Sequence, residues 1–275
     1  MALPETARTV EAASRPLLTQ ILTRDLWIVA ACLAALCALA WWWLWRMASI
    51  PMIAPASGNM GMAAMPMFPS TDVWSAAYLG PTFAMWAIMM VAMMLPSASP
   101  MILLHAAFAR RAGSSADGAT LVFALTYVLL WTGFAALAAL GQALLVSQGI
   151  VAEATFRLGD RTLAAALLAL TALYQLSGLK RLCLARCQSP VSFLMRQWRP
   201  GPAGAARMGI AHGLYCIGCC GLLMLLLFAG GVMNIAWVAI IALVVLAEKY
   251  MPPRLHANWI ISGLLLAGSV ALFLG

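Results

Sequence analysis

The stretch AHGLYCIGCCGLLMLLLF, Ala211 to Phe228, decides the fold class because it is an apolar run without a single charged residue. Together with its flanks it reaches the length of about 18 residues at which an apolar run indicates a membrane-spanning helix. The same run contains three cysteines and a histidine. These side chains act either as packing residues or as metal ligands, and the rest of the chain bears on the choice.

The composition extends the membrane prediction to the whole chain. Of its 275 residues, 64% are hydrophobic and 9% are charged, whereas about 25% of the residues of a soluble domain are charged. The net charge of +8 comes from basic residues in short segments between apolar runs. These segments are too short to follow a phosphate backbone, so nucleic acid is not expected as a partner. The expected partner for most of the surface is the lipid bilayer.

Seven apolar runs predict an all-α fold, a polytopic transmembrane helical bundle in which residues 26–275 form one domain after an amino-terminal segment, 1–25. The first run has no small-residue cleavage site after it, so a retained helix is expected rather than a signal peptide. Gly230, Gly231 and Asn234 predict a tight turn between the fifth and sixth runs. The predicted spans are 26–46, 81–107, 119–147, 162–179, 208–229, 232–249 and 256–274.

Lysine and arginine favour one side of the predicted membrane, as the positive-inside rule requires. The amino-terminal segment and the basic loop 180–207 are therefore expected to be cytoplasmic, whereas the Met-rich loop 47–80 and the carboxyl terminus are expected to be external. The cytoplasmic side holds Arg8, Arg15, Arg24, Arg110, Arg111, Lys180, Arg181, Arg186, Arg196, Arg199, Arg207, Lys249 and Arg254, and the external side holds Arg46, Arg157 and Arg161.

One face of the fifth predicted span collects soft and imidazole side chains. Residues three and four apart share a helix face. Thiolate and thioether groups select copper(I), zinc is the second option, and imidazole accepts either metal. The pattern therefore predicts a metal site, most readily for copper(I). Its candidate ligands are His212, Cys216, Cys219, Cys220 and Met224.

A second cysteine pair, Cys183 and Cys187, lies in the basic loop. The pair is expected on a helical continuation of the fourth span that Pro190 ends. Spans four and five follow each other in the chain, so they are expected to lie side by side and antiparallel. The pair then approaches the cytoplasmic end of the fifth span, near His212 and Cys216. A thiol-rich pocket at or just inside the cytoplasmic boundary is predicted.

Two alternatives to metal binding stay open for these cysteines. Free cysteine packs as a small apolar residue, and small residues are favoured where membrane helices approach closely. Cys32 and Cys37 in the first span have no soft neighbours at helical spacing except each other, so packing is expected for them. A disulfide between Cys183 and Cys187 is the second alternative, which a reducing compartment and the i, i+4 geometry disfavour.

Methionines of the external loop form a second group of candidate ligands. Thioethers bind copper(I) without deprotonation, so they work where free thiols would be oxidised. The alternative is a flexible apolar loop that lies on the bilayer surface. The candidates are Met60, Met62, Met65 and Met67.

The second predicted span carries two helical rows of methionine. Pro96 and Pro100 follow them and predict a kink that leaves backbone carbonyls in need of other partners. Such a helix can pass a soft cation inward towards His105, or its methionines can serve as adaptable packing residues. One row is Met85, Met89 and Met93, of which the last two are candidate ligands, and the other is Met90 and Met94.

Glu248 and Lys249 lie at the inner end of the sixth predicted span. Ionisable residues at membrane depth are candidates for function. Glu248 is a candidate partner that orients His212 or His256 beside the metal. The alternative is a boundary anchor whose lysine reaches the interface.

Three segments together resemble one known family. They are MWAIMMVAMMLPSASP, YQLSGLKRLCLARCQSPVSFL, and GLYCIGCCGLLMLLLFAGGVMNIAW with the later EKYMP. The combination is similar to the bacterial family of predicted metal-binding integral membrane proteins, catalogued as a domain of unknown function, over most of residues 80–253. Gly178 and Gly221 stand where that family has proline and tryptophan. The motif residues carried over are Cys183, Cys187, Cys216, Cys219, Cys220, Met224, Met233, Asn234, Glu248 and Lys249.

The resemblance implies copper rather than zinc, a bacterial inner membrane and a small partner protein or metallochaperone. Together with the residues, it favours a multi-pass protein that binds copper(I) in copper uptake, delivery or homeostasis, without enzymatic activity. The alternative is a non-catalytic membrane subunit that stabilises a partner complex and whose cysteines are structural. A membrane oxidoreductase is disfavoured because the chain has no recognisable haem pair, flavin loop or quinone motif.

Overall fold

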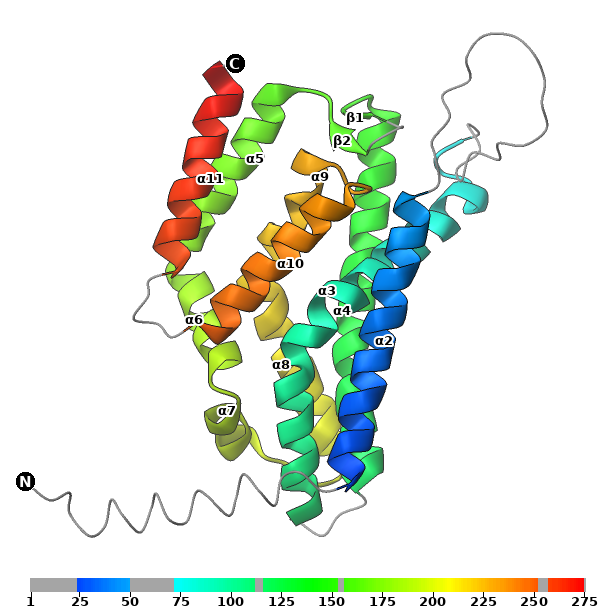
Figure 1. The fold of residues 1–275 in the computed structure, drawn as a ribbon, viewed down its shortest axis with the longest axis vertical. Helices are drawn as coiled ribbons and strands as arrows, with labels where there is room; N and C mark the ends of the chain where they lie inside the picture. The colour runs from blue at the N-terminus through cyan, green and yellow to red at the C-terminus, as the bar shows by residue number, and fades with distance from the viewer. Residues whose placement is uncertain (1–23, 50–71, 112–115, 153–155, 252–256, 275) are drawn as a thin grey trace, which may run out of the picture.

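The computed structural model describes residues 24–49, 72–111, 116–152, 156–251 and 257–274. Over these residues the chain is almost entirely helical, which confirms the all-α prediction (Figure 1). The exception is an antiparallel pair of two-residue strands, β1 (Val151–Ala152) and β2 (Arg157–Leu158). The helices are α2 (Arg24–Ala48), α3 (Ala76–Arg111), α4 (Ala116–Ser147), α5 (Arg161–Gln175), α6 (Gly178–Gln188), α7 (Pro190–Gln197), α8 (Gly201–Leu225), α9 (Leu227–Gly230), α10 (Ile235–Tyr250) and α11 (Ala257–Leu274).

Within the described residues, five helical stretches are long and apolar enough to cross a membrane, and α5 with α6 adds a sixth if the pair counts as one broken span. The five are α2, α3, α4, α11 and the continuous stretch of α8 and α9. The predicted span 232–249 corresponds to α10, which has only 16 residues. Such a helix is about 24 Å long, less than the bilayer core of about 30 Å. The sequence prediction of seven spans overlooked that the turn before α10 shortens this helix.

Helices α3, α4 and α8 form the core of the bundle. α3 packs against α2 and α4, α4 packs along α8, and α5 pairs with α11 (Figure 1). The indole Nε1 of Trp86 on α3 donates to Oε1 of Gln142 on α4 at 2.8 Å, and both side chains are buried. A Cβ atom at Gly209 would lie 2.7 Å from the carbonyl oxygen of Phe123. Glycine therefore permits the close contact between α8 and α4.

The prolines of α3 leave backbone carbonyls that other groups satisfy, as the sequence predicts. Pro96 has no backbone N–H to donate to the carbonyl of Ala92. That carbonyl instead accepts from the indole Nε1 of Trp41 on α2 at 3.0 Å. Pro100 likewise leaves the carbonyl of Pro96 without a backbone donor, and this carbonyl accepts from the hydroxyl of Ser99 at 2.7 Å. With these partners α3 continues as one helix through both prolines.

The helical continuation predicted after the fourth span is a separate helix. The axes of α5 and α6 meet at 65°. Ser177 begins α6 by accepting from the amide of Lys180 at 3.1 Å. Pro190 lies in the first turn of α7, so it ends the continuation where the sequence predicts. The bend directs α6 against α8.

The tight turn predicted between the fifth and sixth spans separates α9 from α10. Gly231 has a φ of 95°, a left-handed conformation that favours glycine. Asn234 caps α10 by accepting from the amide of Trp237 at 3.2 Å. The turn therefore reverses the chain, and α10 descends beside α8 (Figure 1).

Candidate metal centre

Three buried thiols lie together in the middle of α8. Cys216, Cys219 and Cys220 are each at most 1% exposed, and their sulfur atoms all lie within 4.8 Å of one another. Spacings of three and four residues place them on one helix face, as the sequence predicts. These three residues are named the thiol triad. In the described part of the chain it is the one group of at least three His, Cys, Asp or Glu residues with such compact ligand atoms.

Two further sulfur atoms adjoin the thiol triad from other helices. The Sγ of Cys187 on α6 lies 3.9 Å from the Sγ of Cys219. The Sδ of Met94 on α3 lies 3.7 Å from the Sγ of Cys220. The sequence predicts the approach of Cys187, but its candidate ligands on α3 come from the other methionine row. Met94 was therefore missed as a ligand, because nothing in the sequence shows which methionine row of α3 faces α8.

Gly218 allows α6 to come close to α8. A Cβ atom at this position would lie 2.7 Å from the Sγ of Cys183. The hydroxyl of Tyr174 on α5 donates to the carbonyl of Gly218 and holds the end of α5 at the same place. Cys183 therefore reaches α8 as predicted, but its sulfur lies against Gly218 and outside the thiol triad.

A buried lysine contacts the thiol triad. The Nζ of Lys249, at the end of α10, donates to the Sγ of Cys216 at 3.1 Å and to the Oγ of Ser97 at 2.7 Å. The hydroxyl of Tyr127 on α4 lies 3.2 Å from the same sulfur. Lys249 is only 8% exposed, so its ammonium lies inside the protein. Its positive charge stabilises the negative charge of a thiolate, which is the metal-binding form of cysteine.

Glu248 points to a different group of residues. Its carboxylate accepts from Nζ of Lys180 and from Nε2 of Gln175, both at 2.7 Å, and its backbone carbonyl accepts from Nε2 of Gln188 at 2.6 Å. Successive residues of a helix are about 100° apart, so Glu248 and Lys249 face different neighbours. Glu248 therefore does not orient His212, which corrects the sequence-based suggestion; it ties α10 to the junction of α5 and α6. His256 lies outside the described residues.

Neither ring nitrogen of His212 has a hydrogen-bond partner, although the residue is only 2% exposed. The rings of Phe123, Tyr127 and Phe193 surround it, with centroid distances of 6.1, 5.4 and 5.8 Å. His212 lies one helical turn before Cys216 on the same face, and it is not part of the compact group. An unsatisfied buried polar group costs about 1–3 kcal/mol. This imidazole therefore lowers the stability of the fold unless a ligand uses it.

The other methionines predicted as ligands have different surroundings. Met224 on α8 and Met93 on α3 are fully buried. Met89 lines a separate cavity between α3, the end of α2 and the start of α10. Their role as ligands stays a prediction. Four further candidates lie outside the described residues, and they are Met60, Met62, Met65 and Met67.

All seven cysteines are free thiols, so no disulfide joins Cys183 to Cys187. Cys32 and Cys37 lie on α2, where the first is exposed and the second is half-buried. Neither belongs to the compact group of sulfur atoms on α8. These two cysteines therefore provide internal controls for experiments on the thiol triad.

The sulfur geometry fits one soft metal ion. A metal at the centre of three thiolates, with metal–sulfur bonds of about 2.3 Å, holds the sulfurs about 4.0 Å apart. The sulfurs of Cys216 and Cys220 are already 3.9 Å apart, so binding requires only a small movement of the third. Thiolates alone also hold zinc, whereas a thioether such as that of Met94 favours copper(I). The donor set therefore favours copper(I).

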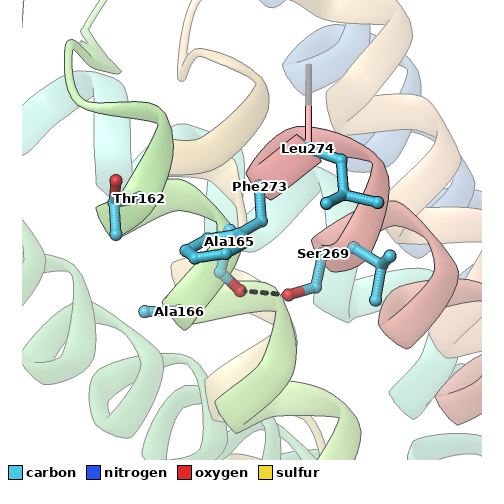
Figure 2. A pocket seen from close by; sticks show the side chains of 7 residues that line it. Thr162, Ala165, Ala166, Ser269, Phe273 and Leu274 are labelled. Carbon is cyan, nitrogen blue, oxygen red and sulfur yellow. Dashed lines mark hydrogen bonds between the residues drawn. The ribbon is translucent and has the colours of Figure 1, made fainter.

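A cavity of about 300 Å³ lies away from the thiol triad, between α5 and α11 (Figure 2). The hydroxyl of Ser269 on its wall donates to the carbonyl of Ala165 at 2.8 Å, which joins the two helices. The residues that line it include no cysteine, methionine, histidine or charged side chain. This cavity therefore offers no ligands for a soft metal.

Comparison with known proteins agrees with this chemistry. The family model PpoB2, described as a copper chaperone, matches residues 83–272. The matched region contains the thiol triad together with Met94, Cys187 and Lys249. No curated protein and no solved structure matches the chain. The match supports the copper-related part of the resemblance drawn from the sequence.

Proposed function

The chain belongs to the copper chaperone family PpoB2, and from this premise we propose that it is a membrane-embedded copper(I) carrier whose thiol triad holds the ion in transit. The observation that carries the proposal is the compact group of three buried sulfurs on α8. The thioether of Met94 beside it supports copper(I) over zinc. Copper is the cargo here, so the site must release the ion as well as bind it.

Lys249 limits the charge that the loaded site buries. Three thiolates and one copper(I) ion together carry two negative charges, and burying uncompensated charge is costly. The ammonium of Lys249, 3.1 Å from the Sγ of Cys216, offsets one of these charges. Lys180, the other buried lysine among the described residues, is paired with Glu248 at 2.7 Å and is not available to the site. A monovalent cargo bound by two or three thiolates suits this balance.

His212 serves as an exchange ligand between the thiol triad and the end of the bundle where α8 begins. A histidine and a cysteine four residues apart on a helix can share one metal ion, and imidazole accepts copper(I). Tyr127 connects the two positions, because its ring stacks on His212 and its hydroxyl contacts Cys216. The surrounding aromatic rings keep water away from an ion in transit.

The location follows as part of the same proposal: a multi-pass protein of the bacterial inner membrane, with a cytoplasmic amino terminus and an external carboxyl terminus. Support comes from the apolar helices of spanning length. In Figure 1, α2 begins at the lower end of the bundle and α11 ends at the upper end. The basic segment 180–207 is the proposed docking site for a soluble metallochaperone or small partner protein.

Metal analysis of the purified full-length chain tests the proposal. The detergent-solubilised protein is loaded with copper(I) under reducing conditions, freed of weakly bound metal with a chelator, and analysed by mass spectrometry and X-ray absorption. We expect about one copper(I) per chain in thiolate coordination, and loss of this thiolate-bound ion in the variant Cys216→Ser, Cys219→Ser, Cys220→Ser.

The matched control is Cys32→Ser with Cys37→Ser, which removes two thiols from α2 and leaves the thiol triad intact. This control is expected to retain the copper of the original chain. Retention of the thiolate-bound copper by the triad variant would overturn the proposal, and displacement of that copper(I) by an equimolar amount of zinc would overturn the choice of metal. Extraction of the membrane fraction at alkaline pH tests the location, since an integral protein stays with the lipid.

A further inference from the structure

Four methionines surround one small cavity near the end of α2. The cavity has a volume of about 20 Å³. The remaining residues that line it are Leu44, Ala48, Val232, Ile235 and Val238, all apolar. The methionines come from three parts of the fold, namely the last turn of α2, the first half of α3 and the turn before α10. They are Met47, Met85, Met89 and Met233, and together they are named the methionine cavity.

We propose that the methionine cavity is a second binding site for a soft monovalent cation, copper(I) or silver(I), separate from the thiol triad. The thioether sulfurs are the only side-chain donor atoms among the residues that line it. Thioethers are neutral and soft, so they bind copper(I) without losing a proton and offer little to zinc or magnesium. A volume of about one small probe sphere, 10–15 Å³ or slightly more, accepts a single atom and no larger ligand.

Packing alone explains the four methionines around this cavity less well than ion binding does. Methionine is a flexible side chain that fills irregular gaps in a core. Four methionines therefore have the freedom to close a space of this size, yet the space persists between them. Met85 and Met89 are only 2% and 1% exposed, so their sulfurs are held inside the protein. The cavity is thus an ion-sized space lined by four residues that each carry a soft donor atom.

The methionine cavity and the thiol triad lie close to the same helix, α3. Met89 lies five residues before Met94, a rise of about 7.5 Å along α3. Met94 contacts the thiol triad through the Sγ of Cys220 at 3.7 Å. Met90 and Met93 lie between them and are also buried. Thioethers thus continue from the cavity to the thiols, so an ion held in the cavity has soft donors on its way to the thiol triad.

The test uses the full-length chain with all seven cysteines replaced by serine, and silver(I) as a redox-stable probe alongside copper(I). Bound metal is measured after exchange into metal-free buffer, and without thiols the thioethers are the sulfur donors that remain. We expect this background to retain about one ion in thioether coordination. Adding Met85→Leu and Met89→Leu should remove that ion, because leucine keeps the volume and apolar character and lacks sulfur.

The matched control adds Met101→Leu and Met208→Leu, two buried methionines that do not line the cavity; it should retain the ion. Equal retention by the cavity variant and this control would overturn the proposal, and would assign the ion to other methionines, including those of residues 60–67. If the thiol-free background melts at a much lower temperature, the same leucine pairs are compared in the unaltered chain, where the cavity variant should bind one ion fewer than the control. Either outcome leaves the role of the thiol triad untouched.

Discussion

Replacing His212 by leucine is expected to stabilise the copper-free protein. The substitution removes two buried ring nitrogens without partners, which contributes about 1–3 kcal/mol, and it loses stacking on the surrounding rings, worth about 0.5–1.5 kcal/mol. Leucine keeps the position apolar and of similar size. The net gain is about 1 kcal/mol, which corresponds to a rise in Tm of about 2–4 °C for a chain of this length.

His105→Leu is the matched control with the opposite expected sign. The Nδ1 of His105 lies 3.2 Å from the Oγ1 of Thr120, and both residues are buried. Leucine at position 105 breaks this hydrogen bond and leaves the threonine without it, so Tm should fall by a similar amount. Thermal unfolding of both variants and the original chain is measured by intrinsic fluorescence in one detergent and without copper.

The second half of the prediction concerns copper exchange. His212→Leu should load copper(I) from a chelator more slowly than the original chain, while the amount of copper bound at equilibrium stays that of the original chain, because the thiol triad is unchanged. A fall in Tm comparable to that of His105→Leu would show that the imidazole supports packing. An unchanged loading rate would refute its role as an exchange ligand.

Three further variants test the surroundings of the site. Lys249→Met should weaken copper(I) binding by about 10- to 150-fold in a competition with a chelator, because it removes a charge-assisted hydrogen bond worth about 1.5–3 kcal/mol; Lys249→Arg should weaken it less. Gly218→Ala places a Cβ atom 2.7 Å from the Sγ of Cys183 on α6, so it should lower both Tm and copper affinity. Gly221→Ala is the control, because its Cβ atom would have its nearest neighbour at 3.5 Å and should change neither quantity. Glu248→Gln leaves the ammonium of Lys180 buried without its charged partner and should lower the free energy of unfolding by about 3–5 kcal/mol. The double replacement Lys180→Met, Glu248→Leu should recover most of the lost Tm. No recovery would contradict the ion-pair explanation.

Helical periodicity carried most of what the sequence predicted correctly. Spacings of three and four residues place the cysteines of α8 on one face, and the structure brings their sulfurs within 4.8 Å. The proline chemistry of α3 predicted carbonyls with unusual partners, and Trp41 and Ser99 supply them. These features depend on local geometry, which a single segment contains in full.

Contacts between helices were harder to predict because they depend on how each helix is rotated about its axis and where it bends. The two methionine rows of α3 are alike in sequence, and only the packing of α3 on α8 selects Met94 as the neighbour of the thiol triad. Glu248 and Lys249 were both candidates for a place beside the metal, but only the end of α10 in the folded chain shows that Lys249 is the one that contacts Cys216. The 65° bend before α6 had only a serine and a glycine to indicate it.

The site is assembled where regular helices are interrupted. Met94 lies two residues before Pro96, which breaks the hydrogen-bond pattern of α3, Cys187 is brought to α8 by the bend before α6, and Lys249 comes from the end of α10. Each interruption is stabilised by its own hydrogen bonds, such as that of Trp41 at α3 and that of Ser177 at α6. The sulfurs of the thiol triad lie within 4.8 Å of one another, close to the spacing of about 4.0 Å that one bound ion would require. Under the proposed function, loading would then need only small movements of side chains that the surrounding hydrogen bonds already hold, which keeps the ordering cost of binding low.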